Sequence, residues 1–402
     1  MDKFDHVQVI DAVMGAGKTT QMIEEIKKSD ASRKFIYITP FLDEIDRIKN
    51  AVTNRKFKAP SNKVEGGKKL TSLKRLIEDG EDIAATHSLF EMADEELIRL
   101  LEMSDYTLIL DEVMDVIDKA EVSPSDMRLL FEQDVIKVED NRVIWHDPQS
   151  KYEWGTFDDI RILAEAGNLY YHRKRFLIWS FPPRVFRAFN KVTILTYLFD
   201  AQIMRYYFDL YEIPYKKYSI KDGEITDYDL YADNRTELFK LIDLYEGEHN
   251  RHGDQSDYAF SKGWMDRREG DELLDIQKSI YSYVRRIAKA KSKDVIWTTI
   301  KDYRHYLKGR GYSKGFIPVN ERATNQYKDR SVVIYAFSRF MNPIERSFFQ
   351  DNGIKVNENL LALSDMLQLI WRSRIREGKP IKLYLPPRRM RKLLKRWANY
   401  EI

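Results

Sequence analysis

The chain has 402 residues, of which 43% are hydrophobic, 67 are Lys or Arg, 64 are Asp or Glu and none is Cys. The hydrophobic share allows a buried core and argues against a disordered chain, and the length suits two or three domains of roughly 100–200 residues each. The absence of cysteine excludes disulfides, thiolate metal sites and cysteine nucleophiles, and it fits a reducing compartment.

Membrane association is not expected from the sequence. No stretch reaches the roughly 18 consecutive apolar residues that a membrane span needs. Residues 1–6 do not have the pattern of a signal peptide. We therefore expect a cytoplasmic protein.

The first part of the chain alternates short apolar runs with stretches of helical spacing. Strands are predicted at 7–10, 35–39, 83–86, 106–110 and 192–197, and helices at 20–26 and 42–48. Strands that alternate with helices form parallel sheets with helices on both faces. The sequence therefore predicts an α/β unit over residues 1–220.

This unit is interrupted by an insertion at about residues 120–190 that contains a predicted hairpin. Two apolar runs, 135–138 and 142–145, are separated by three polar residues, as in an antiparallel hairpin. The hairpin could act on nucleic acid strands or be a decoration of the sheet edge. The segment 221–270 is polar and rich in Asp, Glu and Gly, which predicts a linker or accessory segment.

Residues 271–402 predict a second α/β unit. Strands are expected at 295–299, 332–335 and 381–385, and helices at 276–290 and 360–376. The following stretch, 388–397, is strongly basic. It is either a solvated helix face or a contact for a nucleic-acid backbone.

A phosphate-binding loop is predicted between the first strand and the first helix. Gly15 and Gly17 allow a tight turn whose N–H groups face phosphate oxygens, next to the positive end of a helix. Lys18 is expected to reach the β- and γ-phosphates, and Thr19 to ligate Mg²⁺. The residues expected to hold ATP in this loop are Met14, Gly15, Ala16, Gly17, Lys18, Thr19 and Thr20.

Two carboxylates follow the predicted strand at 106–110. Asp111, at the tip of that strand, can hold Mg²⁺ together with Thr19. Glu112 can polarise the attacking water. Taken alone, two acidic loop residues are common, but the phosphate loop upstream favours the catalytic interpretation.

Arginines near the end of the chain could complete the site. A transferring phosphoryl group needs more positive charge than Lys18 and a metal ion supply, and arginine fingers often provide it from another domain. Arg372 and Arg376 are four residues apart on a predicted helix, so they are expected to share one face. The alternative is a pair of surface arginines, or arginines held by carboxylates such as Asp365.

Taken together, these blocks resemble superfamily 2 helicases, most of all the herpesvirus origin-binding-protein type and the replication helicases of tailed phages. Residues 14–19, 38–40 and 111–114 match helicase motifs I, Ia and II in order and spacing. Motifs III to VI have counterparts at 194–199, 297–301, 322–325 and 368–376. The third lacks the usual Ser-Ala-Thr, and the sixth has Trp371 where glycine is usual, which leaves Arg374 and Arg376 both open as the second finger.

The resemblance implies two RecA-like P-loop domains with a small accessory insertion, and ATP and Mg²⁺ between them. It implies that Gln368 contacts the nucleotide and that Arg372 and Arg376 act on the γ-phosphate. Single-stranded or forked DNA is the implied partner, with replication proteins expected beside it in the host cytoplasm of a phage. The residues that fall where such helicases touch nucleic acid are Thr39, Pro40, Arg47, Thr86, His87, Thr298, Thr299 and Lys301. His87 could instead be an ordinary half-buried histidine.

The predicted function is an ATP-dependent DNA helicase or translocase in phage replication or recombination. A packaging-terminase ATPase is an alternative, but such enzymes add a nuclease with clustered acidic residues, whereas the last third of this chain offers arginines. A P-loop kinase or ATP switch without motor activity is another alternative. A DNA-binding protein with an inactive phosphate loop is the fourth, and the intact Lys18, Thr19, Asp111 and Glu112 argue against it.

Overall fold

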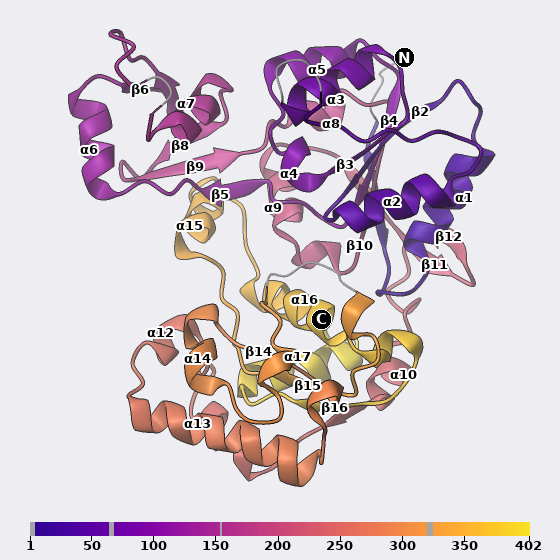
Figure 1. The fold of residues 1–402 in the computed structure, drawn as a ribbon, viewed down its shortest axis with the longest axis vertical. Coiled ribbons are helices and arrows are strands. Elements are labelled where there is room, and N and C mark those ends of the chain that lie inside the picture. The colour runs from indigo at the N-terminus through magenta and orange to yellow at the C-terminus, as the bar shows by residue number, and fades with distance from the viewer. Residues whose placement is uncertain (1–4, 64–67, 153–154, 320–324) are drawn as a thin grey trace.

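A computed structural model describes residues 5–63, 68–152, 155–319 and 325–402 of the chain. It contains three sheets, and Figure 1 shows the two parallel ones in separate halves of the molecule. None of the helices in these ranges combines the length and the apolar character needed to cross a bilayer.

The first sheet has seven strands in the order β12-β11-β1-β10-β4-β2-β3, parallel except for the edge strand β12. Its strands are β1 (Val7–Asp11), β2 (Lys34–Thr39), β3 (Ile83–Thr86), β4 (Tyr106–Asp111), β10 (Lys191–Thr196), β11 (Tyr215–Lys221) and β12 (Glu224–Asp227). Its helices are α1 (Lys18–Lys28), α2 (Leu42–Ala51), α3 (Lys69–Glu78), α4 (His87–Phe90), α5 (Glu95–Glu102), α8 (Arg184–Arg187) and α9 (Ile203–Leu210). We call this sheet and its helices the first unit.

Strand alternation explains why helices cover both faces of this sheet. Phe35 and Tyr37 of β2 point to the core that contains α1 and α2. Ile36 and Ile38 point to the opposite core, which contains α5 and α9. Successive strand residues face opposite sides, so a strand buried on both faces has a continuous apolar run. The sequence contained this signal, and the predicted strands of the first unit are present.

The insertion forms a separate antiparallel sheet between β4 and β10, in the order β5-β9-β8-β7-β6. Its elements are β5 (Ile117–Lys119), α6 (Pro124–Glu132), β6 (Ile136–Glu139), β7 (Arg142–Trp145), α7 (Asp158–Glu165), β8 (Leu169–His172) and β9 (Phe176–Ser180). The predicted hairpin is confirmed as β6 and β7. Asp140 and Asn141 connect them with φ of 47° and 63°, the left-handed conformation that a two-residue hairpin turn requires.

The second unit has a four-stranded parallel sheet in the order β13-β16-β15-β14. Its strands are β13 (Ile242–Leu244), β14 (Val295–Thr298), β15 (Val332–Tyr335) and β16 (Ile381–Tyr384). Its helices are α10 (Arg235–Lys240), α11 (Arg251–Asp254), α12 (Lys262–Met265), α13 (Gly270–Ser282), α14 (Arg304–Leu307), α15 (Pro343–Asp351), α16 (Glu358–Ile370) and α17 (Arg388–Ala398).

Two expectations for this half need correction. The segment 221–270 was expected to be a linker or accessory segment, whereas its strand β12 lies at the edge of the first sheet and its strand β13 at an edge of the second. Its short strands carry too few apolar residues to stand out in the sequence. The helix expected at 360–376 ends at Ile370, where the Ser373 hydroxyl donates a hydrogen bond to the Ile370 carbonyl (2.6 Å). A 3₁₀ turn, η8 (Arg374–Glu377), follows, so Arg372 and Arg376 do not share a helix face.

The two units contact each other directly and through the insertion. Tyr197 and Leu198, after β10, pack into the core of the second unit, and the Trp397 indole N–H donates to the Tyr197 hydroxyl (2.8 Å). On the other side, Arg173 of the insertion forms a two-pronged ion pair with Asp351 of α15 (2.6 and 2.7 Å).

Candidate nucleotide-binding site

The loop between β1 and α1 makes the tight turn that was predicted for it. Gly15 and Gly17 both have φ of 93°, a conformation that side-chain-bearing residues rarely adopt, and Gly17 caps the N-terminus of α1. Lys18 is buried, and its ammonium donates to the carbonyls of Ala12 and Val13. Burial lowers the pKa of Lys18, while the negative charges of Glu112 and Asp111 raise it.

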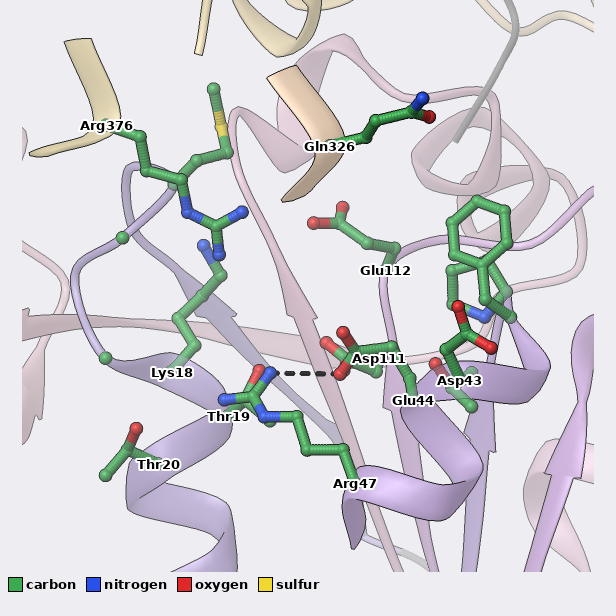
Figure 2. A pocket seen from close by; sticks show the side chains of 16 residues that line it. Lys18, Thr19, Thr20, Asp43, Glu44, Arg47, Asp111, Glu112, Gln326 and Arg376 are labelled. Carbon is green, nitrogen blue, oxygen red and sulfur yellow. Dashed lines mark hydrogen bonds and ion pairs between the residues drawn. The ribbon is translucent and has the colours of Figure 1, made fainter. Parts of the chain in front are cut away.

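A cavity of about 580 Å³ opens over this loop. Figure 2 shows Lys18 and Thr19 on one side of it and Asp111 and Glu112 on the other. The volume is within the ordinary range for small-molecule sites, about 300–1,000 Å³. Of the predicted loop residues, Met14, Gly15, Gly17, Lys18, Thr19 and Thr20 line the cavity, whereas Ala16 packs against the core beside α1.

Asp111 is the last residue of β4, and a tyrosine hydroxyl holds its carboxylate in place. The Tyr37 hydroxyl donates to its Oδ2 (2.9 Å). Burial, followed by the neighbouring charge of Glu112, raises the pKa of Asp111 to about 7. A bound divalent cation offsets the cost of burying a carboxylate charge. Mg²⁺ is usually held by one or two carboxylates together with phosphate and water. Thr19 and Asp111 are therefore the protein groups that could hold Mg²⁺.

Glu112 has an unusual backbone for a glutamate. Its φ is 63°, and its N–H donates to the Leu195 carbonyl of β10 (2.9 Å). A left-handed conformation in a residue other than glycine costs of order 1–3 kcal/mol and is concentrated at functional sites. The turn directs the Glu112 carboxylate into the cavity instead of along the strand (Figure 2).

One arginine of the second unit reaches the phosphate loop. A Cβ placed on Gly15 would lie 3.4 Å from both Cγ and the carbonyl oxygen of Arg376, so η8 packs directly on the loop. The charge of Arg376 is one of the influences that lower the pKa of Lys18. Arg374, the other open choice, is half-buried, and its Nε donates to the Pro380 carbonyl (2.6 Å). The geometry therefore places Arg376, and not Arg374, at this cavity.

Gln368 and Arg372 lie in a neighbouring cavity of about 420 Å³. Arg372 is buried, with 8% of its surface exposed. Glu112 and Arg376 line both cavities, so the two meet at those side chains. Arg372 and Gln368 were expected to face the same space as Lys18, but they line the neighbouring cavity: Gln368 lies within α16, and Arg372 follows the end of that helix, where the chain turns.

The residues predicted to contact nucleic acid are divided between the phosphate cavity and other parts of the molecule. Thr39, Pro40 and Arg47 line the phosphate cavity, where Arg47 pairs with Glu44 (2.9 Å). Each follows or flanks the carboxyl end of β2, and this end faces the phosphate loop.

His87 is only 3% exposed, and its Nε2 lies 3.0 Å from the Asp111 carbonyl oxygen, so it supports the acidic residue from inside. Thr298 and Thr299 are buried, and the Thr299 hydroxyl donates to the Ala336 carbonyl (3.0 Å). Thr86 is half-buried at the end of β3, and Lys301 is exposed. Residues 322–324, matched to motif V, lie outside the described residues.

Two side chains that the sequence did not single out belong to the site. Gln326 reaches the cavity from the second unit in a 3₁₀ turn (Asn325–Tyr327), directly after the block matched to motif V. Asp11 is buried beneath the loop and accepts hydrogen bonds from the N–H groups of Leu198 (2.7 Å) and Phe199 (2.9 Å). Burial raises its pKa to about 6. An acidic residue that ends an apolar strand just before a phosphate loop was the signal for Asp11.

Comparisons with known proteins agree with this architecture. A family model described as the YonV C-terminal Rossmann-like domain matches residues 236–398, and one described as the YonV middle domain matches residues 117–179. The SPbeta prophage-derived uncharacterized protein YonV of Bacillus subtilis (strain 168) is 41% identical over 411 residues, which cover 98% of this chain and 99% of that protein.

Among solved structures, S. tokodaii Xpd4 superposes on 100% of this chain and 95% of its own, with a TM-score of 0.50 at 12% identity. An XPD helicase superposes on 97% of this chain and 94% of its own, with a TM-score of 0.48 at 12% identity. The likeness to Xpd4 concerns the fold alone. Together with the two parallel sheets and the Rossmann-like match, it confirms the predicted α/β fold with two RecA-like units and an accessory insertion.

Proposed function

This chain belongs to the YonV family, and from that premise we propose that it is an ATP hydrolase of the helicase kind, which uses ATP to move along or unwind DNA. The observation that carries the proposal is the contact of Arg376 with Gly15 across the two units. A cation from one unit that shares a cavity with the phosphate loop of the other can couple the state of the nucleotide to the angle between the units.

In this proposal Lys18 and the loop N–H groups bind the triphosphate. Thr19 and Asp111 hold Mg²⁺, which neutralises phosphate charge when it is bound. Glu112 orients the attacking water and accepts its proton. Arg376 stabilises the charge that develops on the transferring phosphoryl group.

Arg372 and Gln368 have a different place in the proposal. They line the cavity on the far side of Glu112. They would come to the nucleotide only if the units move relative to each other, so we assign them to positioning of Glu112 and Arg376 in the arrangement described above. DNA as the substrate is supported by the prophage origin of the relative in Bacillus subtilis. Contacts with a DNA strand through Thr86 and Lys301, and with replication proteins, remain predictions.

The rate of ATP hydrolysis with different polymers tests this function. We expect strong stimulation by single-stranded or forked DNA over the rate without polymer. Equal rates with no polymer, single-stranded DNA, duplex, fork and RNA would favour a kinase or a switch instead. Stimulation by duplex alone, with cleavage of that duplex, would favour the packaging-terminase alternative.

A matched pair of substitutions tests the carrying observation. Arg376→Ala should lower kcat by about 10³-fold or more if the guanidinium stabilises the transition state. Arg374→Ala, two residues away on the same turn, removes an arginine that bonds to the Pro380 carbonyl and should leave kcat within a few-fold. Similar rates for the two variants would remove Arg376 from the mechanism.

A further inference from the structure

Positive charge in this chain is concentrated in one stretch of the second unit. Residues 278–314 contain 11 Lys and Arg against two Asp, a charge of +9. The whole chain has a charge of +3, so the remaining residues together carry −6. A local concentration of positive charge on an otherwise acidic protein is typical of a contact with a polyanion. The basic stretch attracts the polyanion, while the acidic remainder of the surface repels it.

The fold brings two parts of this stretch together. Helix α14 packs against α13, and the Gln277 side chain donates to the Lys308 carbonyl (3.4 Å). Gly311, with φ of 94°, lies against Arg285, whose Cδ would be 3.6 Å from an added Cβ. The π-helical turn after α13 (Tyr283–Ile287) and the loop 308–314 therefore share a surface. We call the six exposed cations on or directly after the turn and in the loop the basic face: Arg285, Arg286, Lys289, Lys308, Arg310 and Lys314.

These cations are available to a ligand. All six are exposed. No ion pair or side-chain hydrogen bond within the described ranges engages them, and none has a further partner. A cation without an internal partner keeps its full charge for an external one, subject only to screening by salt.

The other basic stretch, 388–397, shows the opposite behaviour. Arg389 and Arg391 of α17 are only 7% and 8% exposed and donate to backbone carbonyls inside the second unit. Lys392 and Lys395 pair with Asp257 and Glu246. The expectation of nucleic-acid contact is therefore weaker at α17 than at the basic face, although both are rich in cations.

Aromatic rings accompany the basic face. Tyr306 of α14 is 48% exposed, and its ring centroid lies 3.8 Å from that of His305. Arginine with exposed tyrosine is a combination typical of nucleic-acid surfaces, because guanidinium groups and tyrosine hydroxyls both bond to the phosphate and sugar oxygens of the backbone. A membrane surface would instead call for a continuous apolar face, and Tyr306 and Ile287 are exposed on separate segments.

The position of the basic face separates it from the nucleotide cavity. Figure 1 shows α13 along the end of the second unit that lies away from the first sheet. We propose that the basic face is a second nucleic-acid contact, remote from the cleft between the units, which grips the phosphate backbone of duplex DNA without recognising its sequence. The inference rests on the proposed function only in taking DNA as the polyanion.

Binding of a duplex of about 30 base pairs by the full chain, measured by fluorescence anisotropy between about 50 and 200 mM salt, tests this inference. The triple substitution Arg285→Ala, Arg286→Ala, Lys289→Ala should weaken binding roughly 10- to 100-fold at the lower salt. It should also reduce the slope of log K against log salt by about 2 to 3, since each lost phosphate contact removes about 0.9. The matched control, Lys392→Ala, Lys395→Ala, Arg396→Ala on α17, should change both quantities less.

Additional measurements separate the inference from the proposed function. ATP hydrolysis without polymer should be the same in the triple variant and the wild type, which also checks its folding, and the charge-preserving pair Arg285→Lys, Arg286→Lys should bind duplex normally. Unchanged binding by the triple variant, a larger loss in the α17 control, or wild-type binding to vesicles with anionic lipid but not to duplex would overturn the basic face as a DNA contact. If the triple variant loses binding but DNA never stimulates wild-type hydrolysis, the inference stands and the motor proposal fails.

Discussion

The two units face the nucleotide cavity with unequal contributions. The first unit presents the phosphate loop, Asp111 and Glu112, which lie at the ends of strands β1 and β4 of one sheet. The second presents Gln326 and Arg376, each on a short 3₁₀ turn. Groups at the ends of strands in one sheet keep their geometry relative to one another when the second unit moves. Groups on the second unit move together with that unit. Under the proposed function, the first unit therefore binds the nucleotide and the second senses it.

Loss of Lys18 should break this comparison most completely. Lys18→Ala removes the ammonium that the Ala12 and Val13 carbonyls hold beside the loop. We expect no measurable ATP hydrolysis and weak ATP binding. Lys28→Ala, at the exposed end of the same helix, is the control and should hydrolyse ATP normally. Substantial turnover by Lys18→Ala would reject the phosphate loop as the nucleotide site.

Glu112→Gln should separate binding from chemistry within the first unit. The amide keeps the size and the left-handed backbone but cannot accept a proton, so we expect kcat to fall roughly 10²- to 10⁴-fold with ATP affinity retained. Single-turnover hydrolysis and equilibrium binding of a labelled ATP measure the two effects. Hydrolysis at the normal rate would assign the water-orienting role to another group.

Arg372→Ala sharpens the comparison inside the second unit. Arg372 lies in the neighbouring cavity, whereas Arg376 touches the phosphate loop. We therefore expect a loss in kcat smaller than that of Arg376→Ala by about 10-fold or more, since only Arg376 is placed for transition-state charge. A loss as large as that of Arg376→Ala would mean that both arginines reach the phosphate when the units close.

The smallest expected effect concerns stability against pH at Asp11. Burial raises its pKa from 3.8 to about 6, so the folded chain takes up a proton at this site more readily than the unfolded chain. Its contribution therefore favours folding at low pH and is lost as pH rises from about 4 to 6, by at most about 3 kcal/mol. The free energy of unfolding of the wild type should therefore fall relative to that of Asp11→Asn as the pH rises over this range. A difference that is flat from pH 4 to 7 would contradict the assignment.

Features formed by contiguous chain could be predicted from the sequence. The tight turn after β1, five of the seven strands of the first sheet and the hairpin at 140–141 each depend on local spacing and turn chemistry, and each is present. Features that depend on packing between segments could not. Trp371, directly after the end of α16, packs against Trp397 of α17, and the buried His87 at the start of α4 lies 3.0 Å from the carbonyl oxygen of Asp111 at the end of β4. Likewise, sequence alone did not distinguish the internally bonded arginines of α17 from the free cations of the basic face.

The ion pair between Arg173 and Asp351 has a consequence for movement. It joins the insertion, which is rooted in the first unit, to a helix of the second, while Trp397 and Tyr197 join the same units elsewhere. Both contacts favour the arrangement of the halves described above, and the hydrogen bond from the Gln202 amide to the Ser364 hydroxyl (2.7 Å) acts in the same direction. A movement that widens the space between the halves would have to break some of these contacts, so each of them adds to the free energy that such an opening requires.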